Sequence, residues 1–184
     1  MPTWLIIVLA VAALLVFWII GAYNGLVKLR NRVRDQWAQI DVQLKRRFDL
    51  IPNLVETVKG YTKHESETLE NVVKARNTYL SASTPEAQME ANGELTQAIS
   101  KLFALTEAYP DLKANTNFVK MQDDLKETED KISYARQFYN DTVLTYNNKV
   151  EVIPTNIIAG LFGFKKEAFF EAQGAERENV QVKF

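Results

Sequence analysis

The stretch FVKMQDDLKETEDKISYARQFYNDTVLTY, residues 118–146, repeats a large apolar side chain every seven residues. The repeated positions are Phe118, Leu125, Ile132, Tyr139 and Tyr146. The residues three positions after the first four of these are mostly small or polar: Met121, Thr128, Ala135 and Thr142. Such a heptad is typical of a helix whose neighbours approach closely along one side. The stretch therefore predicts a long helix over residues 116–150 that packs against other helices.

Further helices are predicted upstream of this one, separated by short breaks. The letters TPE at 84–86 form a start signal, because they place an N-cap residue, a first-turn proline and an acid in succession. This helix is expected to end near residue 108, and an earlier one to span residues 63–81 with Thr62 as its cap. The expected fold is all-α, an antiparallel up-and-down four-helix bundle. A parallel coiled-coil dimer is the alternative, but short loops favour packing within one chain.

The stretch RRFDLIPNLVETVKGY, residues 46–61, places a proline inside another amphipathic pattern. Apolar residues at helical spacing continue from residue 24 to the end of this stretch, so a long first helix is predicted to run on from the N-terminal segment. Pro52 removes the hydrogen bond to the Phe48 carbonyl and is expected to kink this helix. Asn53 is the expected donor that helps to satisfy the loosened backbone.

The charged and polar residues of this stretch allow two interpretations. Asp49 lies three residues from Arg46 and four from Asn53, so these side chains share one face of a helix and are expected to pair. A tolerated kink with solvated charges explains all of them. The alternative is a ligand site near Asp49, Asn53 and Tyr61, which requires several polar groups that converge on one pocket.

The N-terminal stretch WLIIVLAVAALLVFWIIGA, residues 4–22, carries no charge over 19 positions. As a helix it would extend roughly 28 Å, close to the thickness of a hydrocarbon core. Trp4, Trp18 and Tyr23 lie near its ends, where interfacial aromatic residues are expected. A transmembrane helix is therefore predicted. The alternatives are a buried core helix and a cleaved signal peptide, although the preceding letters MPT supply no basic residue.

Basic residues follow this segment and none precedes it. Before the first acid of the chain, Asp35, the flank contains Lys28, Arg30, Arg32 and Arg34. Positive charge stays on the cytoplasmic side of a membrane, so the N-terminus is expected outside and the rest of the chain inside. The same side chains are expected to contact anionic head groups of the lipid bilayer.

The C-terminal stretch VIPTNIIAGLFGFKKEAFFEA, residues 152–172, is apolar and contains Phe162, Phe164, Phe169 and Phe170. Such a segment must be covered. It is expected to dock on its own bundle, on a neighbouring subunit or on the bilayer surface. The last residues, 175–184, are expected to form a short strand or a frayed end. The predicted division of the chain is a span over 1–23, a bundle over 24–150 and this segment over 151–184.

Chemistry-bearing motifs are absent from the sequence. Cysteine is absent, His64 is the only histidine, and no Walker loop, GxGxxG turn or GxSxG elbow is present. The formal net charge is −1, from 22 basic and 23 acidic residues, so no basic field recruits nucleic acid. We therefore expect no enzyme activity, no cofactor, no metal site and no nucleic-acid partner.

The sequence resembles the LemA family along nearly all of its length. The stretches that carry the resemblance are YNGLV at 23–27, WAQIDVQLKRRFDLIPNLVETVKGYTKHE at 37–65, EAYPDLKAN at 107–115 and TEDKISYARQFYNDTVLTYN at 128–147. The resemblance implies one N-terminal span, an antiparallel helical bundle and work at membranes. It implies no catalytic residue, because the family has none established.

Together these features predict a non-enzymatic, membrane-anchored scaffold or adaptor. Self-association is expected, because an amphipathic bundle with an aromatic tail offers two interfaces. Such an assembly would organise or remodel the membrane, or recruit a cytoplasmic protein partner whose identity the sequence does not give. The alternative function is a ligand-sensing or partner-recruiting module with the polar site described above.

Overall fold

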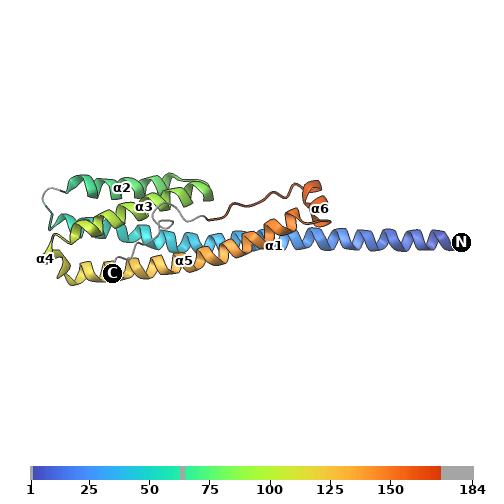
Figure 1. The fold of residues 1–184 in the computed structure, drawn as a ribbon, viewed down its shortest axis with the longest axis horizontal. Helices are drawn as coiled ribbons and strands as arrows, with labels where there is room; N and C mark the ends of the chain where they lie inside the picture. Colours follow the sequence, from blue (N-terminus) through green and yellow to red (C-terminus); the bar gives the residue numbers. More distant parts are fainter. Residues whose placement is uncertain (1, 63–64, 171–184) are drawn as a thin grey trace, which may run out of the picture. The chain divides into compact units, whose positions relative to one another are not determined.

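The structure is a computed structural model that describes residues 2–62 and 65–170. Within these residues the only regular secondary structure is helical (Figure 1). The helices are α1 (Thr3–Lys59), α2 (Ser66–Ser81), α3 (Pro85–Thr106), α4 (Pro110–Lys113), α5 (Thr116–Glu151) and α6 (Thr155–Leu161). The all-α prediction, with a long apolar N-terminal helix followed by packed helices, is confirmed. His64 and the predicted terminal strand at 175–184 lie outside the described residues.

The chain forms two compact units. Within the described residues, the span unit contains residues 2–37 and 137–169, and the bundle unit contains residues 38–62, 65–136 and 170. Helices α1 and α5 each contribute one part to each unit. Helix α1 crosses the predicted boundary between residues 23 and 24 without a break, which confirms that the apolar segment continues into the first long helix.

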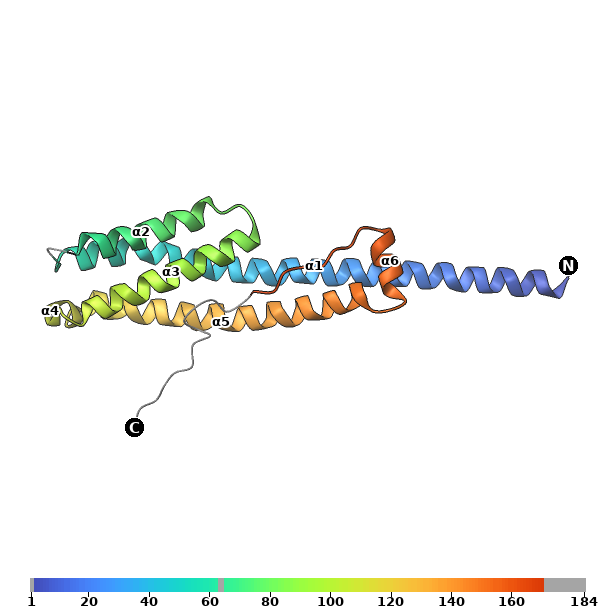
Figure 2. The same ribbon diagram turned by 45° about the horizontal axis from the view of Figure 1, so that its top comes forward.

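In the bundle unit, successive long helices run in opposite directions, as Figure 2 shows for the end of α1, α2, α3 and the start of α5. Their apolar faces meet in one core. The fully buried residues include Ile40, Leu44, Ile51, Leu54, Val58, Val72, Leu95, Leu102, Phe118 and Ile132. Each such side chain contributes roughly 1.5–3 kcal/mol through burial. All five large residues of the heptad in α5 are buried, two of them in the span unit, as their spacing predicts.

Of the two helix caps predicted from the sequence, one is correct and one is wrong. The Thr84 side chain caps α3 by accepting the N–H of Ala87 at 3.2 Å, as predicted. The prediction of Thr62 as the cap of α2 is wrong, because its hydroxyl donates to the Val58 carbonyl and α2 begins at Ser66. At the start of α5, an unpredicted cap forms when the Asn115 side-chain oxygen accepts the N–H groups of the next turn.

Helix α1 continues through Pro52 to Lys59. The Phe48 carbonyl, which the proline deprives of its intrahelical donor, accepts a hydrogen bond from Nε of Arg76 in α2 at 3.2 Å. The expected donor, Asn53, has an exposed side chain instead. The backbone defect in α1 is therefore satisfied by a neighbouring helix. The kink at Pro52 stays a prediction.

A second contact between α1 and α2 lies one turn from Arg76. The Tyr79 ring stacks on the Phe48 ring with centroids 3.7 Å apart, and its hydroxyl donates to Asp41 at 3.0 Å. Burial raises the pKa of the Tyr79 hydroxyl above its ordinary value, and the hydrogen bond to Asp41 raises it further. Together Arg76 and Tyr79 fasten α2 to the segment of α1 that contains the proline.

In the span unit, the buried side chains of α5 include Tyr139, Val143 and Tyr146, and those of α1 include Leu26 and Val33. The Trp37 and Tyr139 rings meet edge to face at 5.7 Å. After α5 the chain forms α6, which Figure 1 places beside α1 and the end of α5.

Helix α6 ends in a Schellman motif. The N–H of Phe164 donates to the Ala159 carbonyl at 2.9 Å, and the N–H of Gly163 donates to the Gly160 carbonyl at 3.3 Å. Gly163 adopts φ of 69°, a left-handed conformation that glycine tolerates best. This turn reverses the chain and sends the following residues back along α5.

The contact between Arg76 and Phe48 predicts a thermodynamic coupling with Pro52. Replacing Arg76 by Met should lower the free energy of unfolding by about 1–3 kcal/mol, because a carbonyl loses its donor. In a Pro52→Ala background the backbone N–H of residue 52 can supply that donor, so the same replacement should cost less. Chemical denaturation of the full chain in detergent, followed by circular dichroism, measures both costs.

Lys74→Met is the matched control, because Lys74 is an exposed cation of α2. It should show the same small effect in both backgrounds. Pro52→Ala alone should leave stability unchanged or raise it, since an interior proline costs about 3 kcal/mol relative to alanine. An equal cost of Arg76→Met with and without the proline would show that the hydrogen bond does not compensate for it.

Candidate functional site

The apolar segment of α1 is the clearest functional feature of the span unit. Its most apolar window of 18 residues has a mean hydropathy of 3.0, and none of that window is buried within the protein. Trp4, Trp18 and Tyr23 are all exposed on its surface. In the part of the chain that the structure describes, this is the one helix long and apolar enough to cross a membrane.

The basic residues after this segment do not all face solvent. Lys28, Arg32 and Arg34 are exposed. Arg30 is partly buried, and its guanidinium carbon lies 4.9 Å from the centre of the Phe164 ring, in cation–π geometry. Three of the four predicted flank residues are therefore accessible to head groups, whereas Arg30 holds the C-terminal segment.

The four C-terminal phenylalanines have different surroundings. Phe164 is buried in the span unit against Tyr23, with centroids 5.7 Å apart, and Phe162 contacts the same tyrosine at 4.8 Å but stays half-exposed. In the bundle unit, Phe170 is buried with its ring 4.6 Å from the Arg136 guanidinium carbon. Phe169 remains exposed. Only two of the four therefore present a substantial apolar surface.

Residues 164–168, here called the return segment, are tied to α5 by polar contacts. Asn147 donates to the Glu167 carbonyl at 2.9 Å and accepts its N–H at 3.0 Å. The hydroxyl of Tyr146 donates to the Lys165 carbonyl at 2.8 Å, and that of Tyr139 to the Ala168 carbonyl at 2.9 Å. Burial, and then the charge of Glu167, raise the pKa of Tyr146. The return segment thus docks on its own chain.

A buried polar cluster lies at the centre of the bundle unit, around Arg47 of α1. Its Nη1 atom donates to Asn92 at 2.8 Å and to Thr96 at 3.1 Å, both in α3, and lies 3.0 Å from the Glu129 carboxylate of α5. Arg47 and Asn92 are each only 3% exposed. One side chain therefore joins three helices.

The sequence prediction missed this cluster and selected the neighbouring arginine instead. Arg46 is half-exposed and forms its ion pair with Glu127 of α5, at 3.8 Å, rather than with Asp49. A signal for Arg47 was present, because it follows Leu44 by three residues and precedes Ile51 by four. That spacing places it on the buried face of α1.

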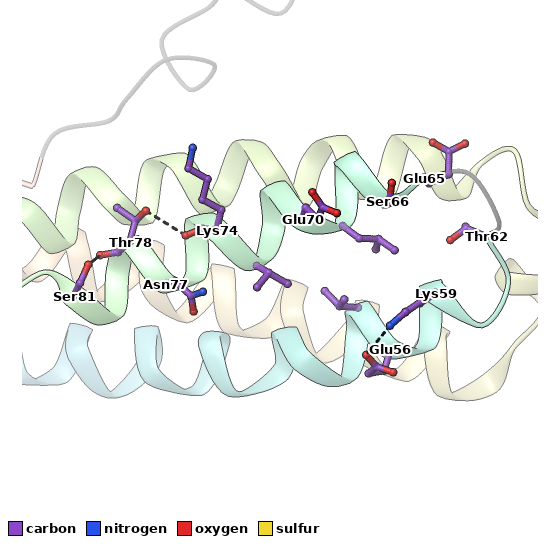
Figure 3. A pocket seen from close by; sticks show the side chains of 13 residues that line it. Glu56, Lys59, Thr62, Glu65, Ser66, Glu70, Lys74, Asn77, Thr78 and Ser81 are labelled. Atoms are coloured by element: carbon purple, nitrogen blue, oxygen red, sulfur yellow. Dashed lines mark hydrogen bonds and ion pairs between the residues drawn. The ribbon is translucent and has the colours of Figure 1, made fainter.

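Two hollows adjoin the bundle helices. A cavity of about 430 Å³ beside Arg47 is lined by both apolar and charged residues. Its lining comprises Arg47, Thr96, Ile99, Ser100, Phe103, Gln122, Leu125, Lys126, Glu129 and Asp130. A larger open groove, of about 1080 Å³, lies between the end of α1 and α2 (Figure 3). Its rim includes Glu56, Lys59, Glu70 and Lys74, so charges of both signs border it.

The residues of the predicted site, Asp49, Asn53 and Tyr61, do not line either of these two hollows. Asp49 and Asn53 are exposed and line neither of them, and the Tyr61 hydroxyl accepts a hydrogen bond from Asn115 at 2.8 Å. Residues 2–62 and 65–170 also contain no group of three acidic or histidine side chains close enough to hold a metal ion. A polar site there stays a prediction.

Comparison with known proteins identifies the family. The LemA family profile matches residues 36–184, so the chain belongs to the LemA family. Protein LemA of Metamycoplasma hominis is 25% identical to this chain, over 90% of it and 76% of the relative. Magnetosome protein MamQ 2 of Paramagnetospirillum magneticum and magnetosome protein MamQ of Magnetospirillum gryphiswaldense are each 23% identical, over 95% of this chain and 74% of theirs.

The Arg47 cluster predicts unequal effects of two adjacent substitutions. Arg47→Met should lower the free energy of unfolding by about 3–5 kcal/mol, because it leaves Glu129 and Asn92 without their buried partner. Arg46→Met, the matched control, should cost less than about 1 kcal/mol, since its ion pair is exposed. Chemical denaturation of the full chain measures both values. Equal costs at the two positions would mean that the buried contacts do not stabilise the bundle.

Proposed function

We propose that this LemA family protein is a non-enzymatic, membrane-anchored scaffold or adaptor. The observation that carries the proposal is the continuity of α1, which holds the uncovered apolar segment and the buried stripe of the bundle unit in one helix. An apolar helix surface of this length is stable when lipid covers it. The helix then holds the bundle unit at the membrane through its own backbone.

We propose that the soluble part lies on the cytoplasmic side. The exposed cations Lys28, Arg32 and Arg34 follow the span closely, and positive residues within this distance of a span favour the cytoplasmic face. On that face they also meet anionic lipid head groups, each contributing about 1 kcal/mol near the surface.

We further propose that the chain associates with copies of itself and thereby organises or remodels the membrane. Several large apolar side chains of the bundle unit remain exposed: Val42, Val73, Leu80, Val119 and Tyr134. The MamQ relatives are named as magnetosome proteins, which is consistent with a role at a shaped membrane. A cytoplasmic protein partner is the other occupant that such a surface would accept.

The cavity beside Arg47 favours a second candidate function, a ligand-sensing module. The apolar lining residues Ile99, Phe103 and Leu125 suit a small apolar group, and the acidic lining residues Glu129 and Asp130 suit a cation. The volume lies within the range of small-molecule sites. The predicted polar site near Asp49 is a separate location for the same function.

Anchoring and orientation are tested together in cells. The full chain with a C-terminal reporter should stay in the membrane fraction after alkaline extraction, and the reporter should be active only in the cytoplasm. Leu14→Arg with Leu15→Arg should release the protein into the soluble fraction, because each arginine at the centre of a span costs about 2.5–3.5 kcal/mol. The matched control, Leu14→Ala with Leu15→Ala, should remain anchored.

A reporter that is active only outside the cytoplasm would reverse the orientation. Release of the unmodified chain by alkali would contradict the anchor itself.

Self-association is tested by light scattering of the detergent-solubilised full chain at micromolar concentration. The protein mass, corrected for bound detergent, should be at least twice the chain mass of 21.0 kDa. Tyr134→Glu should shift this mass toward that of one chain, because it places a charge where an exposed aromatic side chain would be buried in the proposed interface. Ser133→Glu, at an exposed polar neighbour, is the matched control. A strict monomer for the unmodified chain would exclude the proposed assembly.

A further inference from the structure

Helix α6 and the residues that flank it expose an unusual amount of apolar surface. The exposed fractions are 76% for Ile153, 66% for Ile157 and 76% for Leu161, and Val152 and Phe162 are each more than half exposed. Ile157 and Leu161 are four residues apart, so they share one face of the helix. A helix in water does not normally point such a cluster at solvent.

Helix α6 lies beside the end of the apolar segment of α1. The centroids of the Phe162 and Tyr23 rings are 4.8 Å apart, and Tyr23 directly follows the apolar stretch 4–22. A cavity of about 320 Å³ within the span unit is lined by Trp18 and Ala22 of α1 together with Thr155, the first residue of α6. Figure 1 shows α6 beside α1. Helix α6 is therefore next to the predicted interfacial aromatic residues, with its exposed face on the other side.

The orientation of α6 is fixed by its own contacts. Ile158 and Ala159 are buried on the opposite face. The Schellman motif at Gly163 and the paired hydrogen bonds between Asn147 and Glu167 hold the chain that follows it. Since the inner face is packed and both the turn and the return segment are anchored, the outer face cannot rotate inward without breaking these contacts.

We propose that residues 152–162 form a second membrane contact, in which the outer face of α6 lies in the interfacial layer of the bilayer that α1 crosses. The inference rests on the proposed anchoring by α1. Lipid is the occupant because α6 adjoins the segment of α1 already assigned to lipid, through the cavity at Trp18 and the ring contact with Tyr23. A short amphipathic segment in this layer buries its apolar face at the boundary between head groups and acyl chains.

The charges around this face suit an anionic lipid surface. Lys149 precedes α6 and borders the cavity at Trp18, and Lys165 follows it with an exposed side chain. Lys166, also exposed, pairs with Glu151. The outer face itself carries no acid, because residues 152–162 contain no charged residue at all. An apolar face bordered by lysines is typical of segments that lie on membranes.

The test uses single cysteines in the full chain, which has no cysteine of its own. Ile157→Cys and Leu161→Cys, labelled with an environment-sensitive fluorophore, are reconstituted into phosphatidylcholine and phosphatidylglycerol vesicles. Emission should shift to the blue, and nitroxide lipids labelled near the head group should quench it more than lipids labelled near the chain end. Thr145→Cys, at an exposed site of α5 in the same unit, should show neither effect.

A label at Leu14→Cys, within the span, tests the anchor independently of the contact made by α6. This label should be quenched best by the deep nitroxide. If that holds while the labels at 157 and 161 behave like the label at 145, the anchor stands and the second contact is wrong. Blue-shifted labels at 157 and 161 that lipids do not quench, with disulfide cross-linking between copies, would identify a contact between chains instead. An unquenched label at position 14 would overturn both proposals.

Discussion

The constraint on which the structure depends is the backbone of α1, which must satisfy its own hydrogen bonds wherever water is absent. A segment as apolar as residues 4–22 can do so in lipid only as a helix. A helix that has begun adds residues at little further cost, so the same helix continues into the bundle unit with its apolar surface reduced to a stripe. The bundle unit is built on that stripe, and every other long helix packs against it or its neighbours. Breaking α1 would therefore affect both parts at once.

The bundle unit uses polar contacts where apolar packing alone would leave the arrangement of helices open. Apolar stripes accept several registers, whereas Arg47 has hydrogen-bond partners on α3 and an acidic partner on α5 that exist in one register only. Pro52 in α1 acts similarly, because it leaves the Phe48 carbonyl without a donor in its own helix. That carbonyl is satisfied only when Arg76 of α2 lies opposite Phe48. Replacing all members of such a buried cluster by apolar residues would change stability little, whereas removing one partner, or moving it away in a slipped helix, leaves the others unpaired at a large cost in free energy. A defined register keeps the surface of the bundle unit constant, which the proposed scaffold function requires.

The sequence predicted what periodicity controls and missed what depends on contacts between distant residues. The heptad of α5 and the cap at Thr84 were correct, because spacing and local chemistry determine them. Thr62 was wrongly predicted as a cap, since its hydroxyl donates a hydrogen bond to the Val58 carbonyl in the preceding turn. Arg46 was chosen over Arg47 because pairing along one helix can be read from sequence, whereas pairing across three helices cannot. The docking of the return segment was left open for the same reason, as its partners Tyr146 and Asn147 lie on another element.

Arg30 shows that the basic flank has two separate roles, and that its charges are not equivalent. Three of the flank residues are exposed, and in the proposed orientation they act through charge, so lysine and arginine would serve equally well there. Arg30 instead stacks its planar guanidinium on Phe164, a geometry that a lysine ammonium does not reproduce. Phe164 in turn follows Gly163, the residue that ends α6. The position of α6 is thus linked, through one ring and one guanidinium, to the helix that we propose to cross the membrane. Removing that cation would disturb packing as well as charge, so neutralising the whole flank would not isolate its electrostatic role.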